Sequence, residues 1–228
     1  MLTLEHTLRG AWRWGLGWYG RLAGRLRHNR LVIEWVAGRP IVVLPQVFNP
    51  KLLRSGAMLA GALDERLVPE GAAVLDMGTG SGIGAVFAAR RARRVVAVDI
   101  NPEAVRCARI NALLNRVEGR VEVRQGDLFA PLAGERFDVV LFNPPFFRGR
   151  PQDLLDHAWR SVDVAERFAA GLAAHLAPGG RALVILSSDG DERAFLEAFR
   201  AHELRVSVAA RRDLWNEILT IYAIVPSR

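Results

Sequence analysis

From residue 72 onward the sequence alternates segments typical of strands with segments typical of helices. This order is typical of βαβ units built around a mostly parallel sheet. We expect strands at Ala72–Met77, Arg94–Asp99, Val121–Arg124, Phe137–Phe142, Arg181–Leu186, Arg205–Ala209 and Glu217–Val225. We expect helices at Ile83–Arg91, Pro102–Leu114, Val162–Leu176 and Asp191–His202. The chain is therefore predicted to be an α/β protein with a doubly wound, mostly parallel seven-stranded sheet, helices on both faces and an antiparallel last strand.

The first 70 residues have a different pattern and are expected to form an N-terminal region, at 1–70, in front of a main domain at 71–228. Residues 2–27 show helical spacing of apolar residues, with arginines on the remaining face. We expect this helix to dock on the main domain; the alternative is an arm for RNA, a protein or a membrane surface. Behind it we expect a β-hairpin of two short strands and a further helix, at Leu31–Val36, Ile41–Leu44 and Lys51–Leu67.

The chain of 228 residues has a net charge of +7, and most of the excess lies at the front. Residues 1–70 hold ten basic and five acidic side chains, and residues 71–228 hold 21 and 19. We therefore expect the basic N-terminal helix to contact an acidic partner. No apolar run approaches the roughly 18 residues that span a membrane, and arginines interrupt any signal-peptide core. This pattern predicts a cytoplasmic protein without a transmembrane segment.

The composition excludes several kinds of site. Lys51 is the only lysine among 31 basic residues and lies in no glycine loop, which excludes a Gly-x4-Gly-Lys phosphate loop. The single cysteine, Cys107, excludes an internal disulfide and a CxxC site. The five histidines are scattered without metal-ligand spacing. We therefore expect no metal site.

A glycine-rich loop follows the first strand expected in the main domain. It begins after Asp76 and contains Gly78, Thr79, Gly80 and Gly82. Glycines at alternate positions let the backbone turn sharply and let a ligand lie against it. Asp76 is a carboxylate at the carboxyl end of a buried strand, where open α/β sheets bind ligands. A cationic ligand suits this carboxylate better than a pyrophosphate does.

The next two expected strands also end in acids. Asp99 follows Gly82 by 17 residues and suits a ribose diol, which a carboxylate can accept in two hydrogen bonds. Asp127 is either a turn residue or an acceptor for an adenine amine, and three strand-end acids in succession favour the second interpretation. Because Gly80-x-Gly82-x-x-Ala85 also satisfies the dinucleotide fingerprint, an NAD-dependent oxidoreductase stays open at this point.

The motif Asn143-Pro144-Pro145-Phe146 ends the fourth expected strand. Its two prolines fix the backbone beyond the sheet and remove two amide donors, so that the local carbonyls face outward as acceptors. Asn143 adds a side-chain carbonyl, and Phe146 adds a flat apolar face. Together these groups suit a planar NH2 group, with oxygens for its two hydrogens and a ring for its plane. A Pro-Pro turn without a role in binding is the less favoured interpretation.

The motifs resemble, in order and spacing, those of the S-adenosylmethionine-dependent methyltransferases of the small-domain and HemK-like group. The resemblance covers about residues 40–226 and is carried by Asp76-x-Gly78-x-Gly80-x-Gly82, Asp99, Asp127 and Asn143-Pro144-Pro145-Phe146. It implies a class I methyltransferase fold, which is Rossmann-like, and S-adenosyl-L-methionine as the cofactor.

The resemblance also implies roles for single residues. Asp76 and the loop with Gly78, Thr79, Gly80 and Gly82 would hold the amino-acid and sulfonium part of the cofactor. Asp99 would take the ribose hydroxyls. The adenine would pack on Ile100 and bind Asp127 and Leu128, with Asp127 accepting from its amine. Asn143 and the Pro144 carbonyl would accept hydrogen bonds from the substrate amine, while Phe146 stacks on its plane. Asn143 would also contact the cofactor.

Two branches of this group differ in substrate. Val140–Pro145 resembles HemK-like enzymes, which methylate a glutamine of translation release factors, whereas Pro45–Phe48 and Phe146–Gly149 resemble ribosomal RNA enzymes that methylate the exocyclic amine of guanine. We expect N-methylation of a planar NH2 group. A release-factor-like protein glutamine is slightly favoured over RNA, whose target would be a guanine or adenine amine of rRNA or tRNA. Two functions of a different class stay open: the oxidoreductase, which leaves Asn143–Phe146 unexplained, and an RNA-binding module with a vestigial pocket.

Overall fold

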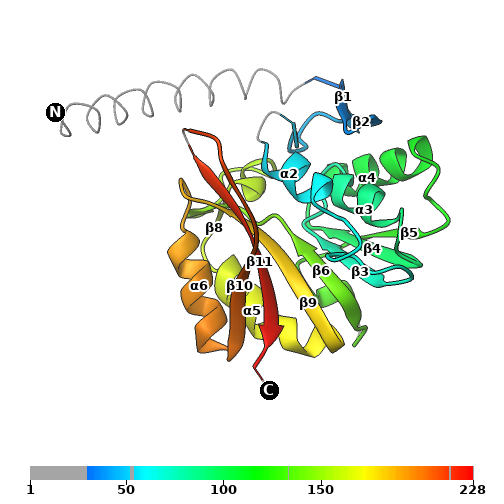
Figure 1. The fold of residues 1–228 in the computed structure, drawn as a ribbon. Coiled ribbons are helices and arrows are strands. Elements are labelled where there is room, and N and C mark those ends of the chain that lie inside the picture. The colour runs from blue at the N-terminus through cyan, green and yellow to red at the C-terminus, as the bar shows by residue number, and fades with distance from the viewer. Residues whose placement is uncertain (1–29, 52–53, 133, 216, 228) are drawn as a thin grey trace.

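The computed structural model describes residues 30–51, 54–132, 134–215 and 217–227. These residues form a seven-stranded sheet with helices on both faces, preceded by a small hairpin (Figure 1). The helix expected at 2–27 lies outside the described residues, so its docking and its acidic partner stay predictions. Within the described ranges, no helix is both long enough and apolar enough to cross a bilayer.

The main sheet has the strand order β10-β11-β9-β6-β3-β4-β5. Its parallel strands are β3 (Ala73–Met77), β4 (Arg94–Asp99), β5 (Val121–Gln125), β6 (Phe137–Phe142) and β9 (Leu176–Ser187). The last strand, β11 (Ile218–Pro226), lies antiparallel between β9 and β10 (Leu204–Asp213). The seven expected strands and the antiparallel direction of the last one are confirmed.

Helices cover both faces of this sheet, which explains why its central strands are continuous apolar runs. α5 (Val164–His175) and α6 (Glu192–Ala201) pack on one face. α2 (Ser55–Gly61), α3 (Ile83–Ala88) and α4 (Pro102–Leu114) pack on the other (Figure 1). All five residues of β3 are buried between these two layers, so the loop that follows β3 starts from a rigid strand.

Two elements differ from those expected by five or more residues at one end. Among the described residues of the helix expected at Lys51–Leu67, only α2 is helical. It ends early because Asp64 forms a turn in which its side chain accepts from the backbone N–H of Arg66 (3.0 Å) and of Leu67 (3.1 Å). β9 begins at Leu176 rather than at Arg181, because Leu176 already pairs with Phe137 of β6 before an irregularity in the ladder.

The hairpin of β1 (Val32–Val36) and β2 (Arg39–Val43) is held by Asn111 of α4 and by Asn115, which directly follows that helix. Asn111 is fully buried; its Nδ2 donates to the carbonyls of Val42 (2.6 Å) and Ser81 (2.8 Å), and its Oδ1 accepts from the Val42 N–H (2.8 Å). Asn115 donates to the Pro40 carbonyl (3.0 Å). α4 therefore joins the hairpin directly to the glycine loop, which contains Ser81. The domain boundary expected at residues 70 and 71 stays a prediction.

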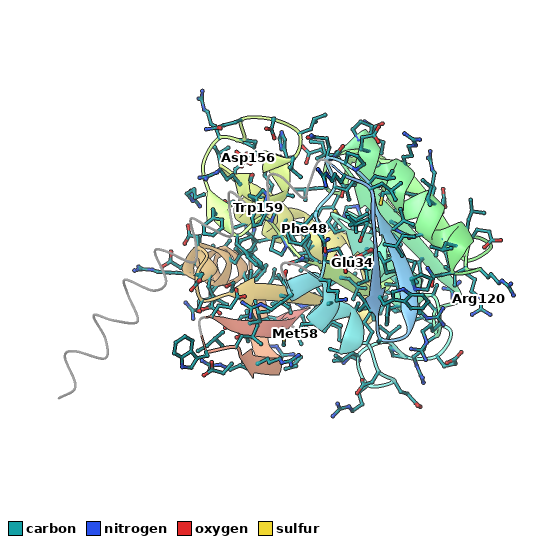
Figure 2. All side chains as sticks on the ribbon, turned by 90° about the horizontal axis from the view of Figure 1, so that it is seen from above. Glu34, Phe48, Met58, Arg120, Asp156 and Trp159 are labelled. Atoms are coloured by element: carbon teal, nitrogen blue, oxygen red, sulfur yellow. The ribbon has the colours of Figure 1, made fainter. Side chains whose placement is uncertain are left out.

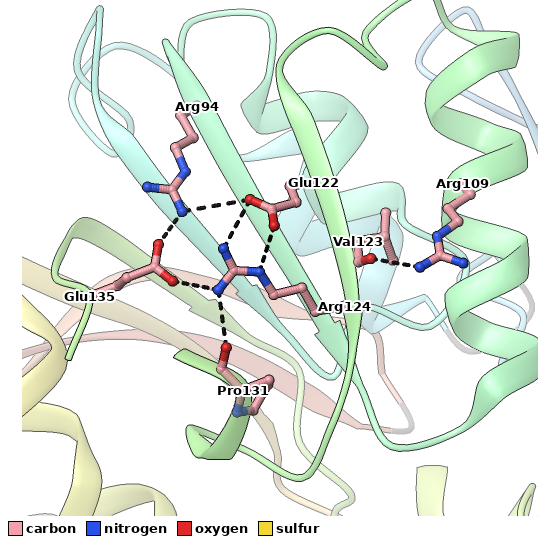
Figure 3. Close-up of polar contacts among 7 residues, drawn as sticks. All are labelled: Arg94, Arg109, Glu122, Val123, Arg124, Pro131 and Glu135. Carbon is pink, nitrogen blue, oxygen red and sulfur yellow. Dashed lines mark hydrogen bonds and ion pairs between the residues drawn. The ribbon is translucent and has the colours of Figure 1, made fainter. Parts of the chain in front are cut away.

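The edge strand β5 has charged side chains on one face. This is the face of the sheet on which α5 and α6 pack against the more central strands. The connection from β5 to β6 contains only the short 3-10 helix η1 (Ala130–Leu132). Arg124 forms ion pairs with Glu122 (2.8 Å) and Glu135, and Arg94 forms a further pair with Glu135 (Figure 3). This network takes the place of an apolar contact with a helix, and its charges also oppose pairing of the edge with another chain.

Candidate active site

The carboxyl ends of β3, β4, β5 and β6 border one cavity of about 410 Å³. Open α/β sheets bind their ligands at this edge. Nine of the predicted site residues line the cavity: Asp76, Gly78, Thr79, Gly80, Asp99, Ile100, Asp127, Leu128 and Asn143. The three predicted site residues outside its lining are Gly82, Pro144 and Phe146.

Asp76 is buried at the end of β3, with only 5% of its surface exposed. Its Oδ2 accepts hydrogen bonds from the Thr79 hydroxyl and from the Ala85 N–H (2.8 Å). Burial raises the pKa of Asp76 to about 7, and the two hydrogen bonds oppose that rise. The carboxylate is therefore anchored to the glycine loop at Thr79 and to α3 at Ala85, and it lies on the cavity wall.

The glycines of the loop adopt backbone conformations that other residues avoid. Gly78, Gly80 and Gly82 have φ angles of 60°, 55° and 80°. A Cβ on Gly82 would lie 2.8 Å from the Cα of Ala108, so this glycine lets α3 approach α4 closely and explains its place outside the cavity lining. A Cβ on Gly80 would have no neighbour closer than 4.0 Å. The loop therefore leaves room for a ligand beside Gly80.

Asp99 lies at the end of β4 and faces the same loop. Its Oδ2 accepts from the Gly80 N–H (2.8 Å), and its Oδ1 accepts from the Asn101 N–H (2.9 Å). Loss of hydration raises the pKa of Asp99, while these backbone donors lower it. Each oxygen keeps a lone pair for a further donor, as a ribose diol requires. The predicted role of Asp99 is thus compatible with its geometry.

Asp127, the third strand-end acid, has a protein partner that the sequence did not reveal. The Nη2 of Arg167, on α5, lies 2.6 Å from Asp127 Oδ2. Ile100 and Leu128 lie on the same part of the cavity wall, and Leu128 has a positive φ of 49°. The four side chains form the end of the cavity beyond Asp99.

Asn143 lines the opposite part of the cavity, just after β6. Its Oδ1 is buried and has no hydrogen-bond partner among the described residues. Ser81 Oγ, which also lies on the cavity wall, is a second buried polar atom without such a partner. A buried polar atom left without a partner costs about 1–3 kcal/mol, so both atoms favour a polar ligand in this cavity.

Pro144 and Phe146 lie farther from the cavity than expected. Pro144 is buried behind Asn143. The Phe146 carbonyl accepts from the Asp191 N–H (2.7 Å), and its Cβ packs against Gly190. Phe146 borders a separate small hollow between its own loop and α6. Its stacking on the substrate stays a prediction.

Two segments without predicted site residues complete the cavity. The loop at 46–50 contributes Phe48, and the connection at 151–163 contributes Pro151, Leu154, His157 and Arg160. The rings of Phe48 and Trp159 lie 5.4 Å apart, centroid to centroid, where these segments meet (Figure 2). The short ladder of β7 (Phe147–Arg148) and β8 (Arg160–Ser161) brings the connection back to the loop that follows Asn143.

These observations fit S-adenosylmethionine better than a metal. The cavity offers a carboxylate beside the glycine loop, a second one at the end of β4 and a third after β5, which are suitable for a cation, a ribose and an amine. Among the described residues, no cluster of three or more histidine, cysteine or acidic side chains is placed to hold a metal ion.

Comparison with known proteins decides the family. The profile of the methyltransferase small domain matches residues 39–210. The chain belongs to this family. The predicted class I fold, the methyltransferase class and S-adenosyl-L-methionine as the cofactor of this domain are confirmed, and the family decides against the NAD-dependent oxidoreductase.

Relatives within the family differ in substrate. The ribosomal RNA small subunit methyltransferase C of Alcanivorax borkumensis is 30% identical over 186 residues, which cover 81% of this chain and 54% of that protein. The release factor glutamine methyltransferase of Cereibacter sphaeroides is 35% identical over 139 residues, which cover 54% of this chain and 50% of that protein. The chain thus spans about half the length of these two curated relatives.

A solved structure has the same fold. The T. thermophilus 16S rRNA N2 G1207 methyltransferase, in complex with AdoMet and guanosine, matches with a TM-score of 0.64 at 24% identity. The match covers 87% of the present chain and 50% of the T. thermophilus chain.

Proposed function

We propose that this small-domain methyltransferase transfers a methyl group to the side-chain amide nitrogen of a glutamine in a protein. The observation that carries the proposal is the buried Oδ1 of Asn143, an acceptor on the cavity wall without a partner among the described residues. A planar NH2 group supplies the missing donor. The free energy that the bare acceptor costs, about 1–3 kcal/mol, is recovered only when such a substrate is in place.

The chain's own residues mainly bind and align the reactants. S-adenosylmethionine supplies an electrophilic methyl group when it is bound. Asp76, the glycine loop and Asp99 hold this cofactor at the ends of β3 and β4. Asn143 Oδ1 accepts a hydrogen bond from an N–H group of the amide and thereby aims the out-of-plane density of its nitrogen. Pro144 lies outside the cavity lining, so the expected second hydrogen bond to its carbonyl stays a prediction. Alignment of this kind is worth up to about 7–11 kcal/mol in favourable intramolecular cases.

The charges around the cavity favour a protein substrate over RNA. Arg167 is paired with Asp127 (2.6 Å), and Arg160 with Asp156 (3.4 Å). Arg148, in the loop after the Asn-Pro-Pro-Phe motif, is paired with Glu166 and with Asp191 (3.6 Å). Binding of RNA depends largely on cations that neutralise phosphates. Arginines already neutralised by carboxylates contribute less to such binding.

The exocyclic amine of an RNA base is the second candidate. Phe48, which lines the cavity together with Asn143 and packs against the ring of Trp159, favours it, since an aromatic side chain in a cavity with an amine acceptor suits stacking on a base. The similarity to a ribosomal RNA methyltransferase over 81% of the chain points in the same direction. Both candidates place the same NH2 group at Asn143 and differ only in what carries it.

A labelling experiment separates the two candidates. The purified chain is incubated with radiolabelled S-adenosylmethionine and a cell lysate, and the product is treated with protease or with ribonuclease. We expect protease alone to release the label, and peptide mass spectrometry to locate the methyl group on a glutamine. Asn143→Ala serves as the inactive control. Label that is released by ribonuclease would refute the glutamine proposal in favour of the RNA candidate.

A further inference from the structure

Arg167 reaches from α5 to the far end of the cavity and binds Asp127. Its Nη2 lies 2.6 Å from Asp127 Oδ2, and its Nη1 lies 3.8 Å from Asp163 Oδ1. Arg167 and both acids line the cavity. The side chains of Arg167 and Asp127 are 46% and 43% exposed, so this pair lies at the border between the cavity and solvent.

The position of Asp127 in the sheet indicates which part of the cofactor it would meet. Asp99, at the end of β4, suits the ribose diol. β5 is the next strand outward, and its end brings Gly126, Asp127 and Leu128 to the same cavity. A purine attached to a ribose at Asp99 therefore extends toward Asp127, where Ile100 supplies an apolar surface. The carboxylate of Asp127 is the acceptor that an amino group meets there.

The ion pair divides the two oxygens of Asp127 between two tasks. Oδ2 accepts from Arg167, whereas Oδ1 has no partner among the described residues. A guanidinium is a planar and permanently charged donor, so its contact with one oxygen restricts the rotation of the carboxylate. Without Arg167, a carboxylate that is 43% exposed would exchange its orientations in water.

We propose that Arg167 is a positioning residue that orients Asp127, so that Oδ1 accepts the amino group of adenine. Arg167 thereby gives the cofactor site its preference for a 6-aminopurine. The inference concerns the cofactor alone and does not depend on which amine receives the methyl group.

The test is a comparison of two ligands by titration calorimetry. The ligands are S-adenosylhomocysteine and its analogue with hydrogen in place of the adenine amino group. We expect the wild-type chain to bind the amino ligand at least about tenfold more tightly, as one charge-assisted hydrogen bond provides. In Arg167→Met this preference should fall to about twofold or less, and Arg167→Lys should restore part of it.

Glu166→Gln is the matched control. Glu166 precedes Arg167 on α5 and forms an ion pair with Arg148, which the substitution removes. Unlike Arg167, Glu166 lies outside the lining of the cofactor cavity. This variant should keep the full preference for the amino ligand. A loss of affinity for both ligands by the same factor in Arg167→Met would overturn the proposal, because it would show a merely structural role. An unchanged preference would overturn it as well.

Discussion

The two halves of the cavity differ in how far the protein satisfies its own polar groups. In the cofactor half, Asp76 and Asp99 each accept two hydrogen bonds from the chain itself. In the acceptor half, the Oδ1 of Asn143 has no donor among the described residues. Folding therefore fixes Asp76 and Asp99 in the cofactor half, although Ser81 Oγ beside them has no partner among the described residues, whereas the Asn143 acceptor is left available to a ligand. Substitutions in the first should change binding and stability, and substitutions in the second should change turnover.

The largest effect is expected from Asn143→Ala. Removal of the acceptor should lower kcat by about 10²–10³-fold, comparable to the loss of one preorganised hydrogen-bonding group at a reacting centre. The dissociation constant of S-adenosylhomocysteine, measured by calorimetry, should change by no more than about twofold, because Asn143 contributes to the acceptor half. A variant that lost cofactor binding but kept its turnover would abolish the distinction between the halves.

Asp76→Asn should alter how stability depends on pH. Because the pKa of Asp76 rises from 3.8 to about 7 on folding, the folded state binds more protons than the unfolded state between these values. The free energy of unfolding therefore decreases as pH rises from 4 to 7, by roughly 3–4 kcal/mol from this group at 1.36 kcal/mol per unit. Urea unfolding at several pH values should show a flatter profile for the variant. Parallel profiles for the two proteins would contradict the assignment.

Asp99→Ala should weaken cofactor binding while leaving the acceptor half intact. Loss of a charged acceptor for the ribose hydroxyls should raise the dissociation constant of S-adenosylhomocysteine by about 10–100-fold. At a saturating concentration of S-adenosylmethionine, kcat should change much less. Asp213→Ala is the control, since Asp213 also accepts a backbone N–H, from Trp215 (2.8 Å), but lies outside the cavity lining. Equal effects of the two substitutions would contradict this prediction.

The smallest effect tests which aromatic ring serves the acceptor half. Phe48 lines the cavity and Phe146 does not, so Phe48→Leu should lower kcat/KM by about tenfold and Phe146→Leu by less than about threefold. Steady-state kinetics with the substrate that accepts the methyl group measures kcat/KM for both variants. The reverse order would restore the stacking role that the sequence predicts for Phe146.

The strands and the cofactor half could be predicted because their signals are local. Buried parallel strands read as apolar runs, and the loop after β3 has glycines at the positions where φ is positive. Asp99 is the last residue of β4 and Asn143 directly follows β6, so the rule that ligands bind at the carboxyl edge places them in the cavity. No contact with a distant segment is needed for these assignments.

The remaining features depend on contacts between distant residues. Asp127 and Arg167 are 40 positions apart, and the periodicity of α5 does not show that its single arginine reaches Asp127. Phe146 is turned toward the hollow beside α6 by contacts with Gly190 and Asp191. The connection at 151–163 has no periodic pattern, and the ladder between β7 and β8 that folds it over the cavity has only two residue pairs.

The buried Asn111 links the β1–β2 hairpin to the glycine loop of the cavity. Its single side-chain amide forms hydrogen bonds with the N–H and carbonyl groups of Val42 in β2 and with the carbonyl of Ser81. If the segment before residue 71 were exchanged for another, the new segment would therefore need a strand whose backbone N–H and carbonyl replace those of Val42 as partners of Asn111. Without one, Asn111 would lose both hydrogen bonds to Val42, and the first part of the main domain to be affected would be the glycine loop that it contacts at Ser81.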